Sequence, residues 1–323
     1  MSKVLITGPT GCIGSATVSY LFNKGVDEII GFSRNADPSR IEPELRDRIQ
    51  MVQGDIANKE QVCELVKAHQ PTHIIHLAAF QTPDCQAYPF RGMDINVAGT
   101  AYLFEAAAEA GSVERFVFAS SSAVYGPRAM YSGDTVPSDG AYKPPNLYGY
   151  WKVCGEGMAQ AFHMETGVST VSLRLSTTYG PGRDKGFTSA PTTAMKSVIR
   201  NEEYVVPYTG REHYHYVHDV AAGFGESCIA PFEGYGAFNL RGRTVPLSDF
   251  LDLVKGAAEE LGIGDQYKVS IADDAMQMPF VCDLDDSDTV AAFPDMSLTD
   301  LKKGVSASLA RFKEMADSGQ DLG

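Results

Sequence analysis

The sequence predicts a doubly wound α/β fold, a parallel sheet covered by helices on both faces, with a smaller C-terminal lobe. Apolar runs of strand length alternate with amphipathic helical patterns through the first half of the 323 residues. These runs are almost continuously hydrophobic, which is typical of strands buried on both faces of a parallel sheet. A glycine-rich turn directly follows the first of them. Because such sheets bind ligands at the carboxyl ends of their strands, we expect the functional residues to lie there.

The elements follow in order along the chain. We expect strands at residues 3–7, 28–32, 49–52, 73–77, 115–119 and 169–175, with helices at 12–24, 58–69, 92–110 and 148–166. After Tyr179 the alternation weakens, and we expect helices near 189–200, 219–230, 247–261 and 298–316 and short strands near 204–207, 214–217 and 236–240. The unit 219–240 is expected to return to the sheet. We therefore assign residues 1–175 and 214–240 to the sheet-bearing core, and residues 176–213 and 241–323 to the smaller lobe.

Composition excludes several classes of partner. Acidic side chains outnumber basic ones by 41 to 27, a net charge of −14, so neither nucleic acid nor an anionic membrane is an expected partner. The six cysteines have no CxxC spacing and resemble the reduced thiols of a cytoplasmic protein. No apolar run reaches the roughly 18–20 residues that span a bilayer. The first expected strand begins at residue 3, which leaves no room for a signal peptide, so we expect a cytoplasmic protein.

The glycine-rich turn reads Leu-Ile-Thr-Gly-Pro-Thr-Gly-Cys-Ile-Gly over residues 5–14. In such a turn Gly8 makes the bend, Gly11 lets the backbone approach a phosphate, and Gly14 lets the next helix pack on the sheet. The N-terminus of that helix offers free N–H groups and the positive end of its dipole to the pyrophosphate of a dinucleotide. A tight turn without a ligand is the alternative, because three glycines alone are a weak signal. The strand before the turn and the amphipathic helix after it favour the dinucleotide site.

Tyr148 and Lys152 are the candidates for acid–base chemistry. They stand four residues apart, so they share one face of the expected helix 148–166. A cation beside a phenol favours the phenolate and lowers the pKa of a tyrosine from its usual value of about 10. Tyr20 and Lys24 have the same spacing, but they lie on the helix after the glycine turn, where a surface pair is the simpler interpretation.

Polar residues that follow two other strands are further candidates. Ser120, Ser121 and Ser122 stand at the carboxyl end of the fifth strand, where a hydroxyl either hydrogen-bonds a substrate oxygen or only caps the strand end. Asp55 follows the third strand, and it either meets the edge of an adenine or caps a turn.

Three polar residues are expected inside the fold. His76 ends the fourth strand and is more simply a packed histidine than a catalyst. Asn96 lies within the expected helix 92–110, where asparagine is disfavoured unless its amide has an internal partner. Arg174 is either an ion-pair partner or a substrate anchor, and we favour the ion pair.

The histidines at 213, 215 and 218 do not predict a metal site. His213 and His215 share one face of a strand, whereas His218 begins the next turn. No cysteine or carboxylate completes a credible set of ligands. A polar wall that faces the substrate is the favoured interpretation.

Eight short motifs together resemble the extended short-chain dehydrogenase/reductases, specifically the NAD-dependent epimerase/dehydratase family. The resemblance runs nearly end to end. Its markers, in the order of the family, are Thr7–Gly14, Gly54–Ile56, His76–Ala79, Asn96–Thr100, Ser120–Gly126, Tyr148–Lys152, Tyr179–Gly182 and Tyr216–Ala221.

The resemblance implies a Rossmann core and a role for each matched residue. Tyr148 would exchange a proton with the substrate hydroxyl, Lys152 would hold the nicotinamide ribose, Ser121 would be the active serine, and Asn96 would support a proton relay to Lys152. The residues expected to bind the cofactor are Gly8, Thr10, Gly11, Cys12, Ile13, Gly14, Ser33, Arg34, Asp55, Ile56, Leu77, Ala78, Ala79, Asn96, Tyr148, Lys152 and Thr177. Those expected to bind substrate are Ser121, Ser122, Tyr148 and Arg211.

Two departures from the family pattern narrow the reaction and the substrate. Dehydratases of the family carry Asp-Glu where this chain has Ser122 and Ala123, so elimination of water from a sugar is not expected. Nucleotide-sugar enzymes often carry an arginine that holds the diphosphate where this chain has Glu212, with Arg211 one residue early. Either the register slips by one residue or that clamp is absent, which would indicate a smaller sugar, sugar acid or polyol-like substrate.

A third departure concerns the cofactor. Members that prefer NAD usually have an aspartate at the end of the second strand, where this chain has Ser33 and Arg34. A hydroxyl and a guanidinium suit the 2′-phosphate of NADP, so NADP is favoured over NAD. Asp37 lies nearby and keeps NAD open.

These observations predict an NAD(P)-dependent hydride transfer at a secondary alcohol or ketone carbon of a sugar-like substrate. A sugar or nucleotide-sugar epimerase and a dehydrogenase/reductase, including one for a small non-nucleotide substrate, both fit. A non-catalytic redox sensor is the alternative from another class, although sensors commonly lose the acid–base tyrosine. By resemblance, helices 92–110 and 148–166 would form the four-helix interface of a homodimer.

Overall fold

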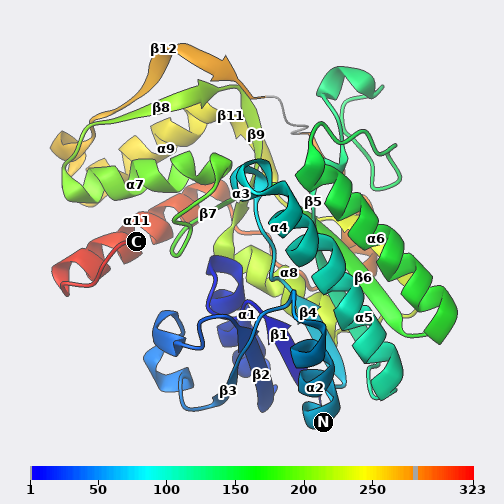
Figure 1. Cartoon of the computed structure of the whole chain (residues 1–323). Coiled ribbons are helices and arrows are strands. Elements are labelled where there is room, and N and C mark those ends of the chain that lie inside the picture. Colours follow the sequence, from blue (N-terminus) through cyan, green and yellow to red (C-terminus); the bar gives the residue numbers. More distant parts are fainter. Residues whose placement is uncertain (1, 279–282) are drawn as a thin grey trace.

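A seven-stranded parallel sheet forms the centre of the computed structural model, which describes residues 2–278 and 283–323 (Figure 1). The strand order is β10-β6-β5-β4-β1-β2-β3. The strands are β1 (Lys3–Thr7), β2 (Glu28–Ser33), β3 (Ile49–Gln53), β4 (His73–His76), β5 (Arg115–Ser121), β6 (Ser169–Leu175) and β10 (Tyr235–Asn239). The order reverses between β1 and β4, and ligands of doubly wound sheets bind at such a switch point. The predicted fold class is confirmed.

Helices cover both faces of this sheet because each carries an apolar stripe. On one face pack α1 (Cys12–Asn23) and α8 (Val217–Ile229), whose Val18, Leu21, Val220 and Phe224 join one core cluster. On the other face pack α2 (Lys59–His69), α5 (Gly99–Ala110) and α6 (Leu147–Thr166), with Val62, Leu103, Phe104 and Phe162 in a second cluster. Among the described residues, no helix is long and apolar enough to cross a membrane.

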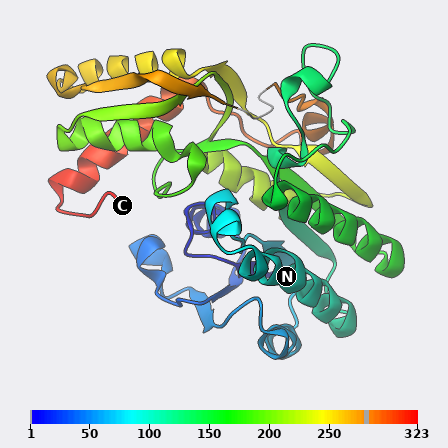
Figure 2. The same ribbon diagram turned by 45° about the horizontal axis from the view of Figure 1, so that its top comes forward.

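A smaller lobe lies across the carboxyl edge of the sheet (Figure 2). It holds a three-stranded sheet, β11-β9-β7, and a two-stranded sheet, β12-β8. Its elements are β7 (Thr177–Tyr179), α7 (Ala190–Arg200), β8 (Tyr204–Thr209), β9 (Arg211–Tyr216), β11 (Arg243–Pro246), α9 (Leu247–Glu260), β12 (Val269–Gln277) and α11 (Leu301–Asp317).

Two segments do not belong to the part of the fold, core or smaller lobe, to which the sequence assigned them. The strand expected at 214–217 is β9, and it belongs to the lobe because it pairs with β7 and β11 rather than with the main sheet. Conversely, α10 (Ser287–Ala292) leads into Phe293 and Met296, which pack in the core cluster of the main sheet.

The helix expected at 92–110 is interrupted. It consists of α4 (Pro89–Met93), a π-helical turn over Asp94–Ala98, and α5; the short helix α3 (Thr82–Ala87) precedes it. Gly92 allows α4 to lie against α6, since a Cβ there would stand 2.5 Å from the Trp151 ring. Asn96 lies in this π-helical turn. An asparagine, which is unfavourable inside a regular α-helix, is accommodated here because the α-helix is interrupted.

Candidate active site

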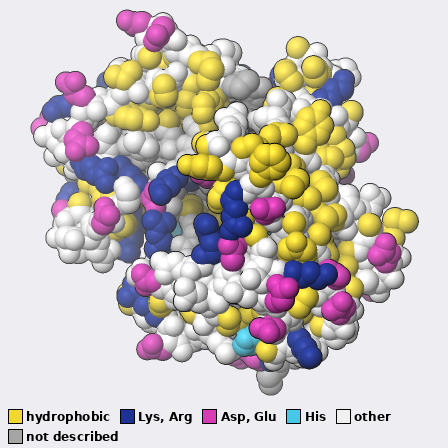
Figure 3. All heavy atoms as spheres, in the orientation of Figure 1, with side chains coloured by type: hydrophobic (Ala, Val, Ile, Leu, Met, Phe, Trp, Pro, Cys, Tyr) yellow, Lys and Arg dark blue, Asp and Glu magenta, His cyan; other side chains and the backbone are white. Residues whose placement is uncertain are grey.

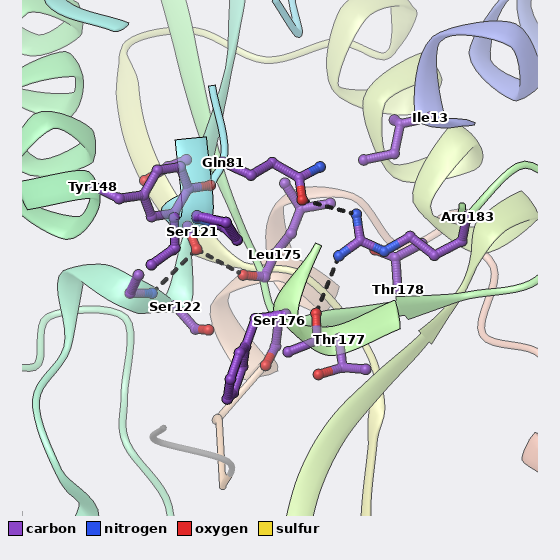
Figure 4. A pocket seen from close by; sticks show the side chains of 16 residues that line it. Ile13, Gln81, Ser121, Ser122, Tyr148, Leu175, Ser176, Thr177, Thr178 and Arg183 are labelled. Carbon is purple, nitrogen blue, oxygen red and sulfur yellow. Dashed lines mark hydrogen bonds between the residues drawn. The ribbon is translucent and has the colours of Figure 1, made fainter. Parts of the chain in front are cut away.

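A pocket lies at the carboxyl ends of β1, β4, β5 and β6, below the lobe (Figure 4). It brings together five predicted site residues from distant parts of the chain: Ile13, Ser121, Ser122, Tyr148 and Thr177. Gln81 and Arg183, which were not predicted, also line it.

The glycine turn lies beside this pocket and has the shape that a pyrophosphate requires. Gly8 has a φ of +72°, which favours glycine, and a Cβ on Gly14 would stand 2.1 Å from the Gly8 carbonyl oxygen. Gly11 caps α1 with no side-chain hydrogen bond to the first turn, and no acidic residue lies there. Thr10 and Cys12 flank Gly11. The N-terminal N–H groups of α1 are thus open to an anion, and these residues fit a dinucleotide.

Thr7 connects this turn to the residues after β4. Its hydroxyl oxygen accepts hydrogen bonds from the backbone N–H groups of Leu77 and Ala78, each 3.1 Å long. With both lone pairs engaged, the hydroxyl donates its proton to His76 Nδ1, 2.7 Å away. Leu77 and Ala78 are thereby held at the switch point, together with the partly buried Ala79.

The imidazole of His76 continues this chain of hydrogen bonds. Because Nδ1 accepts, the proton lies on Nε2, which donates to the Thr100 hydroxyl at 3.0 Å. Thr100 donates in turn to the backbone carbonyl of Asn96 at 2.8 Å. Burial lowers the pKa of His76 to about 3, so the ring is neutral. The interpretation of His76 as a packed histidine is confirmed.

Asn96 is buried and its amide is fully used. Its Oδ1 accepts from the Phe80 N–H at 2.7 Å, and its Nδ2 donates to the Phe80 carbonyl at 3.0 Å. The expected internal partner of the amide is therefore the backbone before α3. Asn96 does not line the pocket, and its part in a proton relay to Lys152 stays a prediction.

A second depression lies beyond β2 and β3, lined by Arg34, Gln53, Gly54, Asp55 and Gln61. Ser33 ends β2 beside it. Asp55 caps a turn by accepting from the Ala57 N–H at 3.0 Å, and it forms an ion pair with Arg91 of α4. The turn-capping role expected of Asp55 is therefore confirmed, and its contact with an adenine stays a prediction. The following Ile56 is buried in the core.

Ser121 and Tyr148 face the main pocket from two elements that pack closely. Ser121 ends β5, where its Oγ accepts from the Ala123 N–H at 3.2 Å and donates to the Leu175 carbonyl at 3.4 Å. Tyr148 lies in the first turn of α6. The next residue, Gly149, lets α6 lie close to the backbone after β5, because a Cβ at this position would stand only 2.2 Å from the Ala123 carbonyl oxygen. The hydroxyls of Ser121 and Tyr148 thus face the same pocket.

Lys152 lies behind Tyr148 and is buried. Its Nζ donates to the Ala119 carbonyl at 2.6 Å and stands 5.6 Å from the centre of the Tyr148 ring. Burial lowers the pKa of Lys152 to about 8. Burial also raises the pKa of Tyr148, although the polar Ser121 hydroxyl nearby works in the opposite direction. The expected net lowering of the tyrosine pKa is therefore wrong for this arrangement, because desolvation of the phenolate is the larger effect.

Arg174 is the ion-pair partner that we favoured. Its Nε and Nη2 donate to the two carboxylate oxygens of Glu156, at 2.9 and 2.7 Å, and both side chains are almost fully buried. Nη1 donates to Tyr125 Oη and to the Ser138 carbonyl. Arg174 thus fastens the loop 126–147 to α6 instead of binding substrate.

Arg211 does not line the pocket, and its role as a substrate ligand stays a prediction. It is 53% exposed and pairs with Asp283 at 3.2 Å. Its neighbour Glu212 points inward and accepts from the hydroxyls of Thr177 and Tyr214, at 2.5 and 3.1 Å. Successive residues of a strand face opposite ways, so only Glu212 reaches the interior.

The histidines of β9 serve the lobe. His213 bonds to Thr244 Oγ1 at 2.8 Å, and His215 Nε2 accepts from the N–H of Ser176, a pocket residue, at 2.9 Å. Burial lowers the pKa of His213 to about 4 and that of His215 to about 3. Across residues 2–278 and 283–323, no cluster of three histidine, cysteine or acidic side chains could hold a metal ion.

Fold and site together define a dinucleotide-binding α/β protein with a serine and a tyrosine hydroxyl in its pocket. The chain belongs to the NAD dependent epimerase/dehydratase family, whose model matches residues 4–227. It is 30% identical over 259 residues to UDP-glucuronate 4-epimerase 1 of Arabidopsis thaliana, a match that covers 72% of this chain and 56% of that protein. The chain spans about half the length of the curated relatives it matches.

Solved structures share the fold over nearly the whole chain. The UDP-glucose 4-epimerase of Thermus thermophilus, in complex with NAD, has a TM-score of 0.82 at 22% identity and covers 96% of this chain and 99% of its own. The L-threonine dehydrogenase of Clostridium difficile has a TM-score of 0.83 at 22% identity, covering 100% and 99%. Proteins named as an epimerase and as a dehydrogenase therefore fit equally well, and the fold alone does not choose between them.

Proposed function

We propose that this chain catalyses NAD(P)-dependent hydride transfer at a secondary alcohol or ketone carbon of a sugar-like substrate. The observation that carries the proposal is the position of Ser121 and Tyr148 in one pocket, beside the glycine turn. When bound, the nicotinamide ring would accept the hydride in oxidation or return it in reduction. Tyr148 Oη would take or give the hydroxyl proton, and Ser121 Oγ would hold the substrate oxygen. Lys152, whose ammonium lies behind the Tyr148 ring, would hold the nicotinamide ribose.

Both an epimerase and a dehydrogenase remain candidates, because they share this step and differ in whether the keto product leaves. A dehydratase does not fit, since Ser122 and Ala123 are buried and supply no acid or base. The epimerase is supported by the similarity to UDP-glucuronate 4-epimerase 1. The dehydrogenase is supported by the position of Arg211, which points away from the pocket and offers no clamp for a diphosphate.

The test is a panel of free sugars, sugar acids and nucleotide sugars with NAD⁺ and NADP⁺. Reduced cofactor is followed by absorbance and the stereochemistry of the product by NMR. Net cofactor reduction indicates a dehydrogenase, and inversion without net reduction indicates an epimerase. Cofactor binding without turnover of any compound would contradict the proposal and favour a redox sensor.

Tyr148→Phe is the decisive variant. Removal of the phenolic oxygen should lower turnover by roughly 10²–10⁴-fold with cofactor affinity unchanged. Tyr20→Phe is the matched control, because Tyr20 stands four residues before Lys24 in the same way, but it does not line the pocket and its hydroxyl bonds to Glu226 of α8. Equal loss in both variants, or none in Tyr148→Phe, would refute the role of Tyr148.

We propose NADP as the preferred cofactor. Arg34 is exposed at the wall of the second depression, at the end of β2. The neighbouring Arg91 is committed to Asp55, so Arg34 is the guanidinium there that can meet a 2′-phosphate.

We also propose a cytoplasmic homodimer. Hydrophobic side chains gather over α4 and the adjoining helices α5 and α6 (Figure 3), and Phe90, Tyr150 and Leu147 are 82, 58 and 48% exposed. An apolar patch of this kind is typical of an interface. The described cysteines are all free, which suits a reducing compartment. Light scattering that returns the mass of one chain would refute the dimer.

A further inference from the structure

Arg183 is the cation of the active-site pocket. It follows β7 and lines the same pocket as Ser121 and Tyr148. Figure 4 shows its guanidinium directed into the pocket, opposite the wall that carries these two hydroxyls.

The guanidinium of Arg183 has only neutral partners. It donates to Gln81 Oε1 at 3.5 Å and to Thr188 Oγ1 at 3.1 Å, and its buried Nε has no hydrogen-bond partner. In the part of the chain that the structure describes, no carboxylate oxygen lies within 4.0 Å of it. Arg183 is half-buried, and its Nε is shielded from water without an acceptor. A buried donor without a partner at the wall of a pocket points to a ligand that accepts from it.

The carboxylates nearest in the sequence are already engaged. Asp184, the next residue, pairs with both Arg40 and Lys196 at 2.7 Å. Glu212 accepts from the hydroxyls of Thr177 and Tyr214 and is buried. Burial raises the pKa of Glu212, whereas the charge of Arg183 works in the opposite direction. Among the described residues neither carboxylate forms an ion pair with Arg183.

The surface around the pocket also favours an anion. The chain carries a net charge of −14, yet basic side chains gather in the hollow between the core and the lobe (Figure 3). Such a local reversal of sign draws anions toward a cleft.

We propose that the substrate carries a carboxylate and that Arg183 binds it, a step that rests on the proposed function of this pocket. The planar guanidinium fork matches a carboxylate with two parallel hydrogen bonds. In the reaction, a CH–OH group of the acid loses its hydride to NAD(P)⁺ and its hydroxyl proton to Tyr148, so that the products are the keto acid, NAD(P)H and one proton. The charge at Arg183 fixes which end of the substrate faces Tyr148.

The proposed substrate is a small acid rather than a nucleotide sugar. The pocket has a volume of about 140 Å³, below the roughly 300–1,000 Å³ of sites that bury drug-sized ligands. At the start of β9, Arg211 points away and the acidic Glu212 faces inward, so these two positions offer no cation to a diphosphate.

The test uses matched acids and neutral compounds on the full chain saturated with NADP⁺. The probes are D-glucuronate and D-galacturonate against D-glucose and D-galactose, and D-gluconate and L-threonate against the corresponding alditols. UDP-glucose and UDP-glucuronate are added as nucleotide sugars. Calorimetric binding at up to 10 mM is measured for each, and turnover by absorbance.

At least one free acid should bind and be oxidised, with kcat/KM at least 100-fold above that of its neutral partner. Arg183→Gln should remove at least 100-fold of that preference, and Arg183→Lys should restore part of it. Arg311→Gln is the control, because Arg311 is an exposed arginine of α11 that pairs with Glu314 and does not line the pocket, and this variant should behave as wild type.

Three results would overturn the proposal: no free acid binds, acids bind Arg183→Gln as tightly as wild type, or neutral or nucleotide sugars are preferred. Loss of NADP⁺ affinity alone in Arg183→Gln would also refute it, because the anion would then be the cofactor pyrophosphate. Turnover of neutral sugars with loss in Tyr148→Phe would refute the carboxylate while leaving the proposed function intact.

Discussion

Arg174 and Arg183 both lie close to the carboxyl edge of the main sheet, yet the fold treats them differently. The guanidinium of Arg174 is 1% exposed and bonds to both oxygens of Glu156. The guanidinium of Arg183 has two neutral partners and an unbonded Nε. The first charge is neutralised within the chain, whereas the second is left for something outside it.

This difference separates a structural arginine from a binding one. A buried ion pair has no charge to spare for a ligand, and its main effect is to keep its own surroundings in place. Here the Arg174 pair fixes the loop 126–147 through the Ser138 carbonyl. Sequence patterns alone do not distinguish the two cases, because the distinction depends on which carboxylates lie nearby.

The largest effect is expected from Arg174→Ala. It leaves the Glu156 carboxylate buried without its cation, so the free energy of unfolding should fall by about 3–5 kcal/mol. Urea unfolding at pH 7.5 measures the change. The double change Arg174→Met with Glu156→Leu should recover part of the loss, since it removes both charges. A loss below about 1 kcal/mol in the single variant would remove the distinction between the two arginines.

A smaller effect on the free energy of unfolding is expected from two buried histidines that stay neutral. The pKa values of His213 and His215, about 4 and 3 in the folded state, lie below the usual value of 6.5. The unfolded chain therefore binds more protons below pH 6.5, and stability falls as the pH falls through this range. Each histidine should cost about 2 kcal/mol at pH 5 relative to pH 7.5.

The variant His213→Gln measures this contribution. It should be less stable than wild type at pH 7.5, but it should lose less on acidification to pH 5, because one titrating group is absent. Identical losses between pH 7.5 and pH 5 in both proteins would show that His213 is not held neutral.

Arg34→Ala tests the proposal that this exposed guanidinium binds the 2′-phosphate of NADP. We expect roughly 10- to 100-fold weaker binding of NADP⁺, with NAD⁺ affinity changed less than about twofold, because one charge-assisted hydrogen bond to the 2′-phosphate is lost. Fluorescence titration with both cofactors provides the measurement. Equal weakening for both would contradict the proposed preference.

The smallest effect is expected from Arg211→Ala. Its side chain is 53% exposed, so the ion pair with Asp283 should contribute less than about 0.5 kcal/mol to stability. Urea unfolding, run beside Arg174→Ala, compares an exposed arginine with a buried one. A loss above about 1 kcal/mol would mean that exposure does not predict the energy of these pairs.

Most of the core could be predicted because its elements are regular. The strands of the main sheet and the helices α1, α2 and α6 agree with the sequence patterns to within a few residues. The placement of β9 was wrong because its alternating polar residues identify a strand but not its partners. The short β7 and β11 that pair with it carry no periodic signal of their own.

The site could be predicted where a local motif carries the chemistry. The glycine turn and the pair of Ser121 and Tyr148 lie in or beside one pocket, as expected. The sequence does not show that Arg211 and Glu212 face opposite ways, which follows from their places on β9 because a strand sends neighbouring side chains to opposite faces. Arg183 escaped prediction since its importance lies in the absence of a carboxylate around it among the described residues, although its position directly after the turn Tyr179–Gly182 is a signal that could have been followed.

The hydrogen bonds from Thr7 through His76 to Thr100 have a consequence for kinetic experiments. Each hydroxyl in the series can donate its proton in one direction only. A second proton on the imidazole, at Nδ1, would therefore face the Thr7 hydroxyl proton, which has no other acceptor to turn to. The imidazole of His76 consequently does not change its protonation state while the chain is folded. Any inflection in a rate profile near neutrality must therefore be sought in other groups.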